Sequence, residues 1–150
     1  MRREDPDLVT GRSRFLADLP LPEGCLHAWF VRSPLPHAQI RSIDTADAVA
    51  AVGVVAVETG ASLGLGPYQH LEALDPGQAR FPLAVDRIRH VGEAVAVVIA
   101  DDPVRAEDAA ELVDVDLEPL EPVVDPTVVP PPVVLYSDTG DNTRTGDNTV

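Results

Sequence analysis

The sequence has no lysine, one cysteine and few aromatic residues, and each shortage excludes a class of chemistry. All 11 basic residues are arginine, which excludes a Schiff-base lysine, a phosphate-loop lysine and a lysine that carries biotin or lipoate. The single cysteine, Cys25, cannot form an internal disulfide, which favours a reducing compartment. No apolar run reaches the ~18 residues of a membrane-spanning helix or follows the charged N-terminus as in a signal peptide. We therefore expect a soluble, cytoplasmic protein.

Negative charge dominates the remaining composition. The 25 acidic residues give the 150-residue chain a formal net charge of -14, which phosphate backbones and anionic lipids would repel. We therefore expect neither a nucleic-acid partner nor membrane insertion. Apolar residues make up 45% of the chain but aromatic residues only 4%, so short strands rich in valine should form the core.

The order of apolar runs and turn residues predicts a small α+β domain over residues 23–125. Residues 1–22 have no sustained periodicity and are predicted to form an extended N-terminal arm without a helix. Residues 126–150 read as a proline-rich linker followed by a disordered tail that contains the repeat TGDNT. Gly and Pro punctuate the loop over residues 59–82, and the sequence does not indicate its role.

Six strands and two helices are expected within this domain. Suitable N-caps precede both helices, Asp44 or Thr45 for the first and Asp101 or Asp102 for the second, and Gly53 suits the end of the first helix. The run AVAVVIA belongs at the centre of a sheet, and the first two strands should pair with each other in antiparallel fashion. The expected strands are residues 26–32, 38–44, 54–58, 83–90, 94–100 and 113–117.

No pattern of reactive side chains indicates a catalytic or metal site. The serines lack a nucleophile-elbow context, Cys25 has no close basic neighbour, and GLGPYQ lacks the third glycine of a dinucleotide loop at Gly64 and Gly66. The carboxylates between Asp101 and Asp125 fall on positions typical of a solvated face, although carboxylate pairs can also serve acid–base chemistry or calcium binding. The histidines lack metal-ligand spacing; they are His27, His37, His70 and His90. The serines are Ser13, Ser33, Ser42, Ser62 and Ser137.

One short segment, FVRSPLPHAQI, predicts how its side chains are placed. Arg32 ends a predicted strand, and Pro34 and Pro36 fix the backbone so that His37 stands at a rigid corner. A hairpin turn with a hydrogen-bonded histidine is the simpler interpretation, and a functional role for His37 is the alternative.

Five motifs in a fixed order resemble the opening of the large subunits of molybdenum hydroxylases, the family of xanthine dehydrogenase, aldehyde oxidase and carbon monoxide dehydrogenase. They cover nearly all of the chain up to about Asp125. The motifs are EDPDLVTGRSRFLADL, FVRSPLPHAQIRSID, GVVAVETGASL, PLAVDRIRHVGEAVAVVIA and AEDAAELVDVDLEPLEPVVD.

The resemblance implies the α/β-hammerhead fold, a small mixed sheet with two helices and an N-terminal arm. It implies a fragment or separately encoded piece of a molybdopterin-dependent oxidoreductase that packs against cofactor-binding domains and is not catalytic alone. FAD and iron–sulfur clusters would lie on partner subunits, and this chain would supply no catalytic, cofactor-binding or metal-binding residue. The resemblance thus implies a structural role, without catalysis, for Arg32, Asp44 and the Val91–Glu93 turn. The alternative is a free-standing binding or assembly module without a redox role.

Overall fold

The computed structural model describes residues 3–15, 18–68, 80–125, 127 and 133–136. Its strands form two three-stranded sheets, and all four strand pairings are antiparallel. The α+β class is confirmed, although the strands divide between two sheets where one was expected. The tail with the TGDNT repeat and His70 lie outside the described residues.

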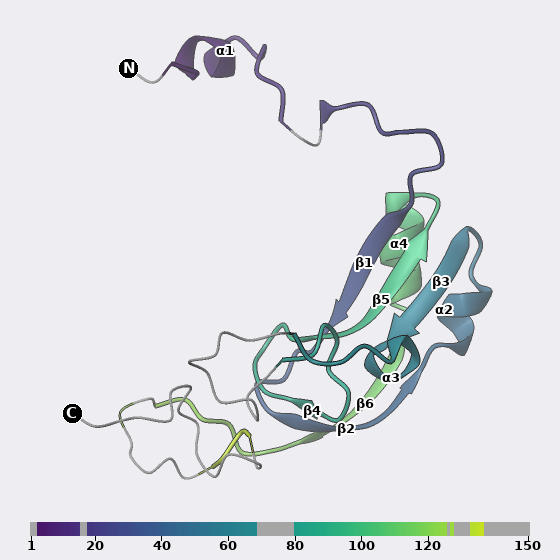
Figure 1. The fold of residues 1–150 in the computed structure, drawn as a ribbon, viewed down its shortest axis with the longest axis vertical. Coiled ribbons are helices and arrows are strands. Elements are labelled where there is room, and N and C mark those ends of the chain that lie inside the picture. The colour runs from purple at the N-terminus through teal and green to yellow at the C-terminus, as the bar shows by residue number, and fades with distance from the viewer. Residues whose placement is uncertain (1–2, 16–17, 69–79, 126, 128–132, 137–150) are drawn as a thin grey trace.

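Sheet A has the strand order β1-β5-β3 (Figure 1). It consists of β1 (His27–Arg32), β5 (Ala94–Ala100) and β3 (Val54–Thr59). The run AVAVVIA is thus the central strand, as predicted. The expected pairing of β1 with β2 is wrong, because β1 pairs with β5 from His27 opposite Ala100 to Arg32 opposite Ala94.

Sheet B has the strand order β4-β2-β6. It consists of β4 (Arg87–Ile88), β2 (Ala38–Asp44) and β6 (Asp114–Pro119). The strand expected over residues 83–90 is therefore only two residues long. The segment between β1 and β2 carries the chain from one sheet to the other, and prolines at two of its five positions cannot donate to a hairpin ladder.

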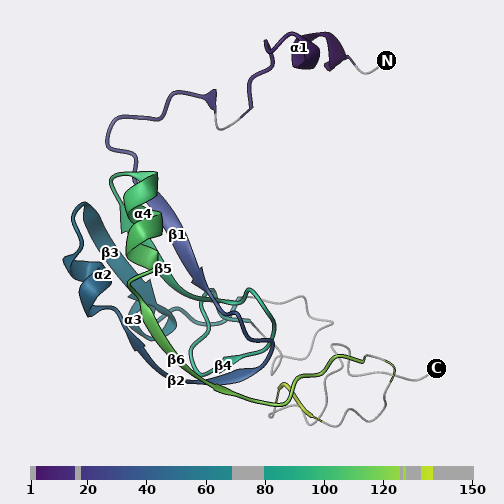
Figure 2. The ribbon, with the colours of Figure 1, turned by 180° about the vertical axis from the view of Figure 1, so that it is seen from behind.

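Two helices cover one face of sheet A. They are α2 (Ala46–Ala50) and α4 (Pro103–Ala110), and Figure 2 shows α4 lying over β1 and β5. The carboxylate of Asp102 caps α4 by accepting hydrogen bonds from the amides of Val104 and Arg105, at 2.9 and 3.3 Å. The two expected helices are confirmed, although α2 ends at Ala50, before Gly53. The short helix α3 (Gly60–Leu63) lies within the long loop.

Small side chains fill the space between sheet A and its helices. The buried cluster consists of Ala48, Ala96, Val98, Ala109, Ala110 and Val113. A second cluster, of Ala38, Ala84, Ile88 and Val95, lies where the two sheets meet. Alanine lets helix and strand backbones approach closely, which explains how this core packs without aromatic residues. Gly60 allows a similar approach, because a Cβ there would lie 2.7 Å from the carbonyl oxygen of Leu83.

The N-terminal arm extends away from both sheets (Figure 1). It contains the short helix α1 (Asp5–Val9), so the expectation of an arm without a helix is wrong. Pro6 lies in the first turn of α1, where a missing amide proton costs no hydrogen bond, and acidic residues precede and follow it. Across the described residues, no helix combines the length and apolar character needed to cross a membrane.

Candidate functional site: the corner and the open face

The corner after β1 pairs with the turn before β5. A guanidinium nitrogen of Arg32 donates to the carbonyl oxygen of Gly92 at 2.9 Å. The amide of Ser33 donates to the carbonyl of Glu93 at 2.9 Å, and the amide of Gly92 donates back to the carbonyl of Ser33 at 2.8 Å. Gly92 adopts a positive φ of 81°, which a side chain would disfavour. The Arg-Ser-Pro and Val-Gly-Glu motifs thus form one structural unit.

His37 joins this unit to the segment that follows β6. The side chain is 3% exposed, and its Nδ1 donates to the carbonyl oxygen of Glu121 at 2.7 Å. The amide of Leu120 in turn donates to the carbonyl of His37 at 2.9 Å. Nε2 has no hydrogen-bond partner among the described residues. The hairpin interpretation is wrong because β1 and β2 belong to different sheets, but the histidine is hydrogen-bonded as expected, through Nδ1 alone among the described residues. The prolines beside His37 predict its place at a corner, but no local pattern predicts that Leu120 and Glu121 contact it.

The hydroxyl of Ser33 is held in a local turn. It is buried, donates to the carbonyl of Leu35 at 3.0 Å and accepts from the amide of Leu35 at 3.1 Å. Ser62 has an equally local role, because it completes the capping box at the start of α3 with Thr59. Cys25 is exposed at the end of the arm. These contacts assign structural roles to both serines.

The carboxylates between Asp101 and Asp125 are all exposed, which confirms the interpretation as a solvated face. Asp101 forms an ion pair with Arg105 at 2.9 Å, and Glu118 forms one with Arg41. Hydrogen bonds from the Thr127 hydroxyl and amide lower the pKa of Asp125 below its ordinary value of 3.8.

The remaining candidate residues, two histidines and the two glycines of GLGPYQ, lie on different parts of the fold. His27 lies half-buried on β1 and His90 is exposed beyond β4. Gly64 has a φ of 59° and ends α3, while Gly66 belongs to the loop that follows. Within the described ranges, no group of three or more His, Cys, Asp or Glu residues is placed to hold a metal ion.

The face of sheet A opposite α4 is mostly apolar and is left open by the described residues, although Glu58 on β3 lies on it opposite Val97. Opposed residues in antiparallel strands share a face, so the apolar side chains of Phe30, Val97, Ile99 and Ala56 lie on the same side. Phe30 is 44% exposed, and the other three are half-buried although Val97 and Ile99 belong to the central strand. We call these four residues the open face; Figure 1 shows no helix over β1 and β5 on this side.

The open face ends where sheet B begins. Val95, two residues before Val97 on the same side of β5, is buried in the cluster with Ala38 and Ile88. None of the four open-face residues belongs to either core cluster. The sequence contained a signal for this surface, because a run without polar alternation, AVAVVIA, presents apolar groups on both faces of a strand.

Comparisons with known proteins agree with this fold. Residues 10–121 match the family described as aldehyde oxidase and xanthine dehydrogenase, a/b hammerhead domain. The nicotine 6-hydroxylase large subunit of Paenarthrobacter nicotinovorans is 43% identical over 130 residues, which cover 83% of this chain and 16% of that protein. The carbon monoxide dehydrogenase large chain of Afipia carboxidovorans is 42% identical over 125 residues, which cover 83% of this chain and 15% of that protein.

A solved structure of Cu,Mo-CO dehydrogenase in its carbon monoxide reduced state is similar over the whole chain. It has a TM-score of 0.74 and 35% sequence identity, and it covers 100% of this chain and 19% of the solved chain. This chain therefore spans less than one fifth of the length of these relatives. The ordered motifs, the two sheets and these matches together show that the chain belongs to the aldehyde oxidase and xanthine dehydrogenase α/β-hammerhead domain family.

Proposed function

We propose that this chain is the hammerhead domain of a molybdenum-dependent oxidoreductase large subunit and packs its open face against the cofactor-binding domains of that enzyme. The observation that carries the proposal is the apolar open face itself. A large exposed apolar patch marks a contact surface, and each 100 Å² of apolar area removed from water contributes about 2.5 kcal/mol before the costs of association. The described residues leave this face uncovered.

The residues described here do not fit the cofactor of such an enzyme. No group of metal ligands converges among them, and the polar groups of the corner mostly bond to backbone within the domain. We therefore assign no chemical step to them and propose that the chain is not catalytic alone. The complete enzyme would hydroxylate a carbon centre with oxygen from water, or oxidise an aldehyde or carbon monoxide, with FAD and iron–sulfur clusters on cytoplasmic partner subunits.

Binding to a relative tests the packing proposal. The partner is the large chain of Afipia carboxidovorans carbon monoxide dehydrogenase, produced without the region that matches this chain. Size-exclusion chromatography with light scattering should show a one-to-one complex. Phe30→Asp should weaken it at least tenfold, because a carboxylate would replace an apolar ring at the interface. Val104→Asp is the matched control, since Val104 is an equally apolar exposed residue on α4.

Two results would contradict the proposal. A folded wild-type chain that forms no complex, or a Phe30→Asp chain that binds as well as the wild type, would remove the role of the open face. The absence of independent catalysis has its own test: aldehyde or purine oxidation by the purified chain, with one molybdenum atom per chain, would refute it. If light scattering showed a stable homodimer of the chain alone, the result would favour a free-standing assembly module.

A further inference from the structure

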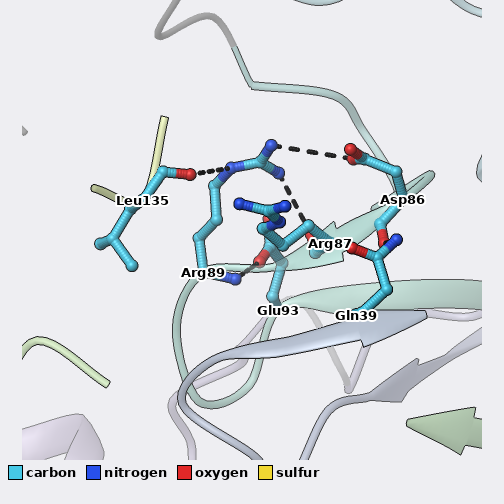
Figure 3. A network of polar contacts seen from close by, with 6 residues as sticks. All are labelled: Gln39, Asp86, Arg87, Arg89, Glu93 and Leu135. Atoms are coloured by element: carbon cyan, nitrogen blue, oxygen red, sulfur yellow. Dashed lines mark hydrogen bonds and ion pairs between the residues drawn. The ribbon is translucent and has the colours of Figure 1, made fainter. Parts of the chain in front are cut away.

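Arg89 stands at the centre of a polar network just after β4 (Figure 3). Its Nε donates to the carbonyl oxygen of Leu135 at 3.3 Å, and one terminal nitrogen donates to the carbonyl of Arg87 at 3.1 Å. The other terminal nitrogen lies 3.7 Å from a carboxylate oxygen of Asp86. Each side of the planar guanidinium fork therefore has a partner, and one of these partners lies 46 residues further along the chain.

The ring of Tyr136 adds a second contact to the same guanidinium. The centre of the Arg89 guanidinium lies 5.0 Å from the ring centroid, within the range of a cation–π interaction. Residues 133–136 are all half-buried, and the side chain of Arg89 is only 22% exposed. The cavity that remains between Arg89, Tyr136 and their neighbours measures about 10 Å³, close to the space that one water molecule needs. Residues 133–136 are therefore packed against the domain.

Arg89 itself is held in place from the other side. Its amide donates to the carboxylate of Glu93 at 2.6 Å, and the side chain of Gln39 on β2 donates to the carbonyl of Asp86 at 2.7 Å. These bonds connect Arg89 to sheet B and to the turn that pairs with the corner. The folded domain thus fixes the position of the guanidinium, and the guanidinium in turn binds residues 133–136.

We propose that Arg89 is a positioning residue that holds residues 133–136 against the segment just after β4, so that the chain leaves the domain from a fixed point. His37 holds the same outgoing chain earlier, at Leu120 and Glu121. With anchors at both places, the folded unit extends to Tyr136, past the boundary at residue 125 that the sequence predicted. The proposal concerns only contacts within this chain and does not rest on the proposed function.

Chymotrypsin offers a direct test, because it cleaves after aromatic residues and the fragments that end at the two tyrosines, Tyr68 and Tyr136, can be told apart by mass. Tyr68 is 60% exposed and serves as the internal reference. Cleavage after each tyrosine is followed by mass spectrometry in native buffer, and each rate is divided by its rate in urea. In the wild-type chain, the corrected rate at Tyr136 should be lower than at Tyr68. Equal corrected rates would overturn the proposal without any variant.

Substitution of Arg89 tests its role in holding the segment. Arg89→Ala should raise the rate at Tyr136 relative to Tyr68 by roughly fivefold or more, since the rate follows the population of the undocked segment. Arg89→Lys should be intermediate, because an ammonium keeps the charge but lacks the fork. Arg41→Ala is the matched control: Arg41 is an exposed arginine of sheet B that pairs only with Glu118 among the contacts described.

A merely structural role for Arg89 gives a different result. If the residue only stabilised the whole fold, Arg89→Ala would lower the free energy of unfolding in urea, and cleavage at Tyr136 would rise no more than the larger unfolded population accounts for. That outcome, or a ratio no different from that of Arg41→Ala, would overturn the proposal.

Discussion

Val97 and Val98 are neighbours on β5 whose side chains lie on opposite sides of sheet A, and they should respond differently to the same substitution. Val98 is 0% exposed and belongs to the cluster beneath α2 and α4. Val98→Ala removes two methyl groups, worth about 1.6 kcal/mol of transfer free energy, and leaves a cavity that raises the loss of stability to about 2–3 kcal/mol.

Val97→Ala removes the same atoms from the open face. Val97 is half-buried, belongs to neither core cluster, and leaves no enclosed cavity when it is shortened. The expected loss of stability is therefore about 1 kcal/mol or less. For a domain of this size, 1 kcal/mol corresponds to a change in melting temperature of roughly 4–8 °C, so the two variants should melt about 5–15 °C apart.

Urea unfolding followed by far-UV circular dichroism measures both losses, with thermal melting as a second reading. The slopes of the urea transitions should match that of the wild type, which shows that the denatured states are comparable. Losses that agree within about 0.5 kcal/mol would refute the reasoning, because they would mean that the open face is as well covered as the helical face.

Three further predictions concern the backbone and the charges. Gly60→Ala should destabilise the chain by about 1–3 kcal/mol in urea unfolding, because the new Cβ would lie 2.7 Å from the carbonyl oxygen of Leu83. Asp102→Ala should cost about 1 kcal/mol in the same assay, since two amides of α4 lose their acceptor. In NMR titration of the side-chain carboxyl, Asp125 should have a pKa below 3.8, and Thr127→Val should raise it. Because the folded pKa is lowered, the Asp125–Thr127 contact is present above the ordinary pKa and lost as the pH falls through the folded value.

The two stability predictions each have a control in the chain. Gly66→Ala should be tolerated, since a Cβ there would meet no atom within 4 Å. Asp108→Ala on the exposed side of α4 should leave stability within about 0.5 kcal/mol of the wild type. A loss as large as that of Asp102→Ala would contradict the capping argument. An Asp125 pKa at or above 3.8 in the wild type would contradict the titration argument.

Strands and helices that are encoded by a short stretch of sequence could be predicted from that stretch. The uninterrupted apolar run identified β5, and an N-cap followed by proline identified the start of α4. The absence of apolar periodicity in the arm predicts no helix there, yet Pro6 stands in the first turn of α1, where proline is favoured. The same residue type therefore has opposite meanings at the start and in the interior of a helix, and the sequence of the arm has no apolar periodicity that would distinguish them.

The pairing of strands was beyond local reasoning. Arg32 contacts Gly92, 60 residues away, and nothing in either segment specifies the other. The proximity of the first two strands in the sequence favoured a hairpin, but β1 and β2 belong to different sheets. The burial of His37 depends on residues more than 80 positions later, so its place at a corner was predictable and its partner was not.

The open face explains why a central strand can look fully buried in the sequence and half-buried in the structure. β5 is apolar on both sides, yet the described elements cover only the side of Val98 and the end near Val95. Folding of this chain therefore draws its hydrophobic stabilisation mainly from one side of sheet A. The other side contributes only when something covers it. If that cover is a cofactor-binding domain, binding and stability are coupled, and the complex should unfold at a higher temperature than the free chain.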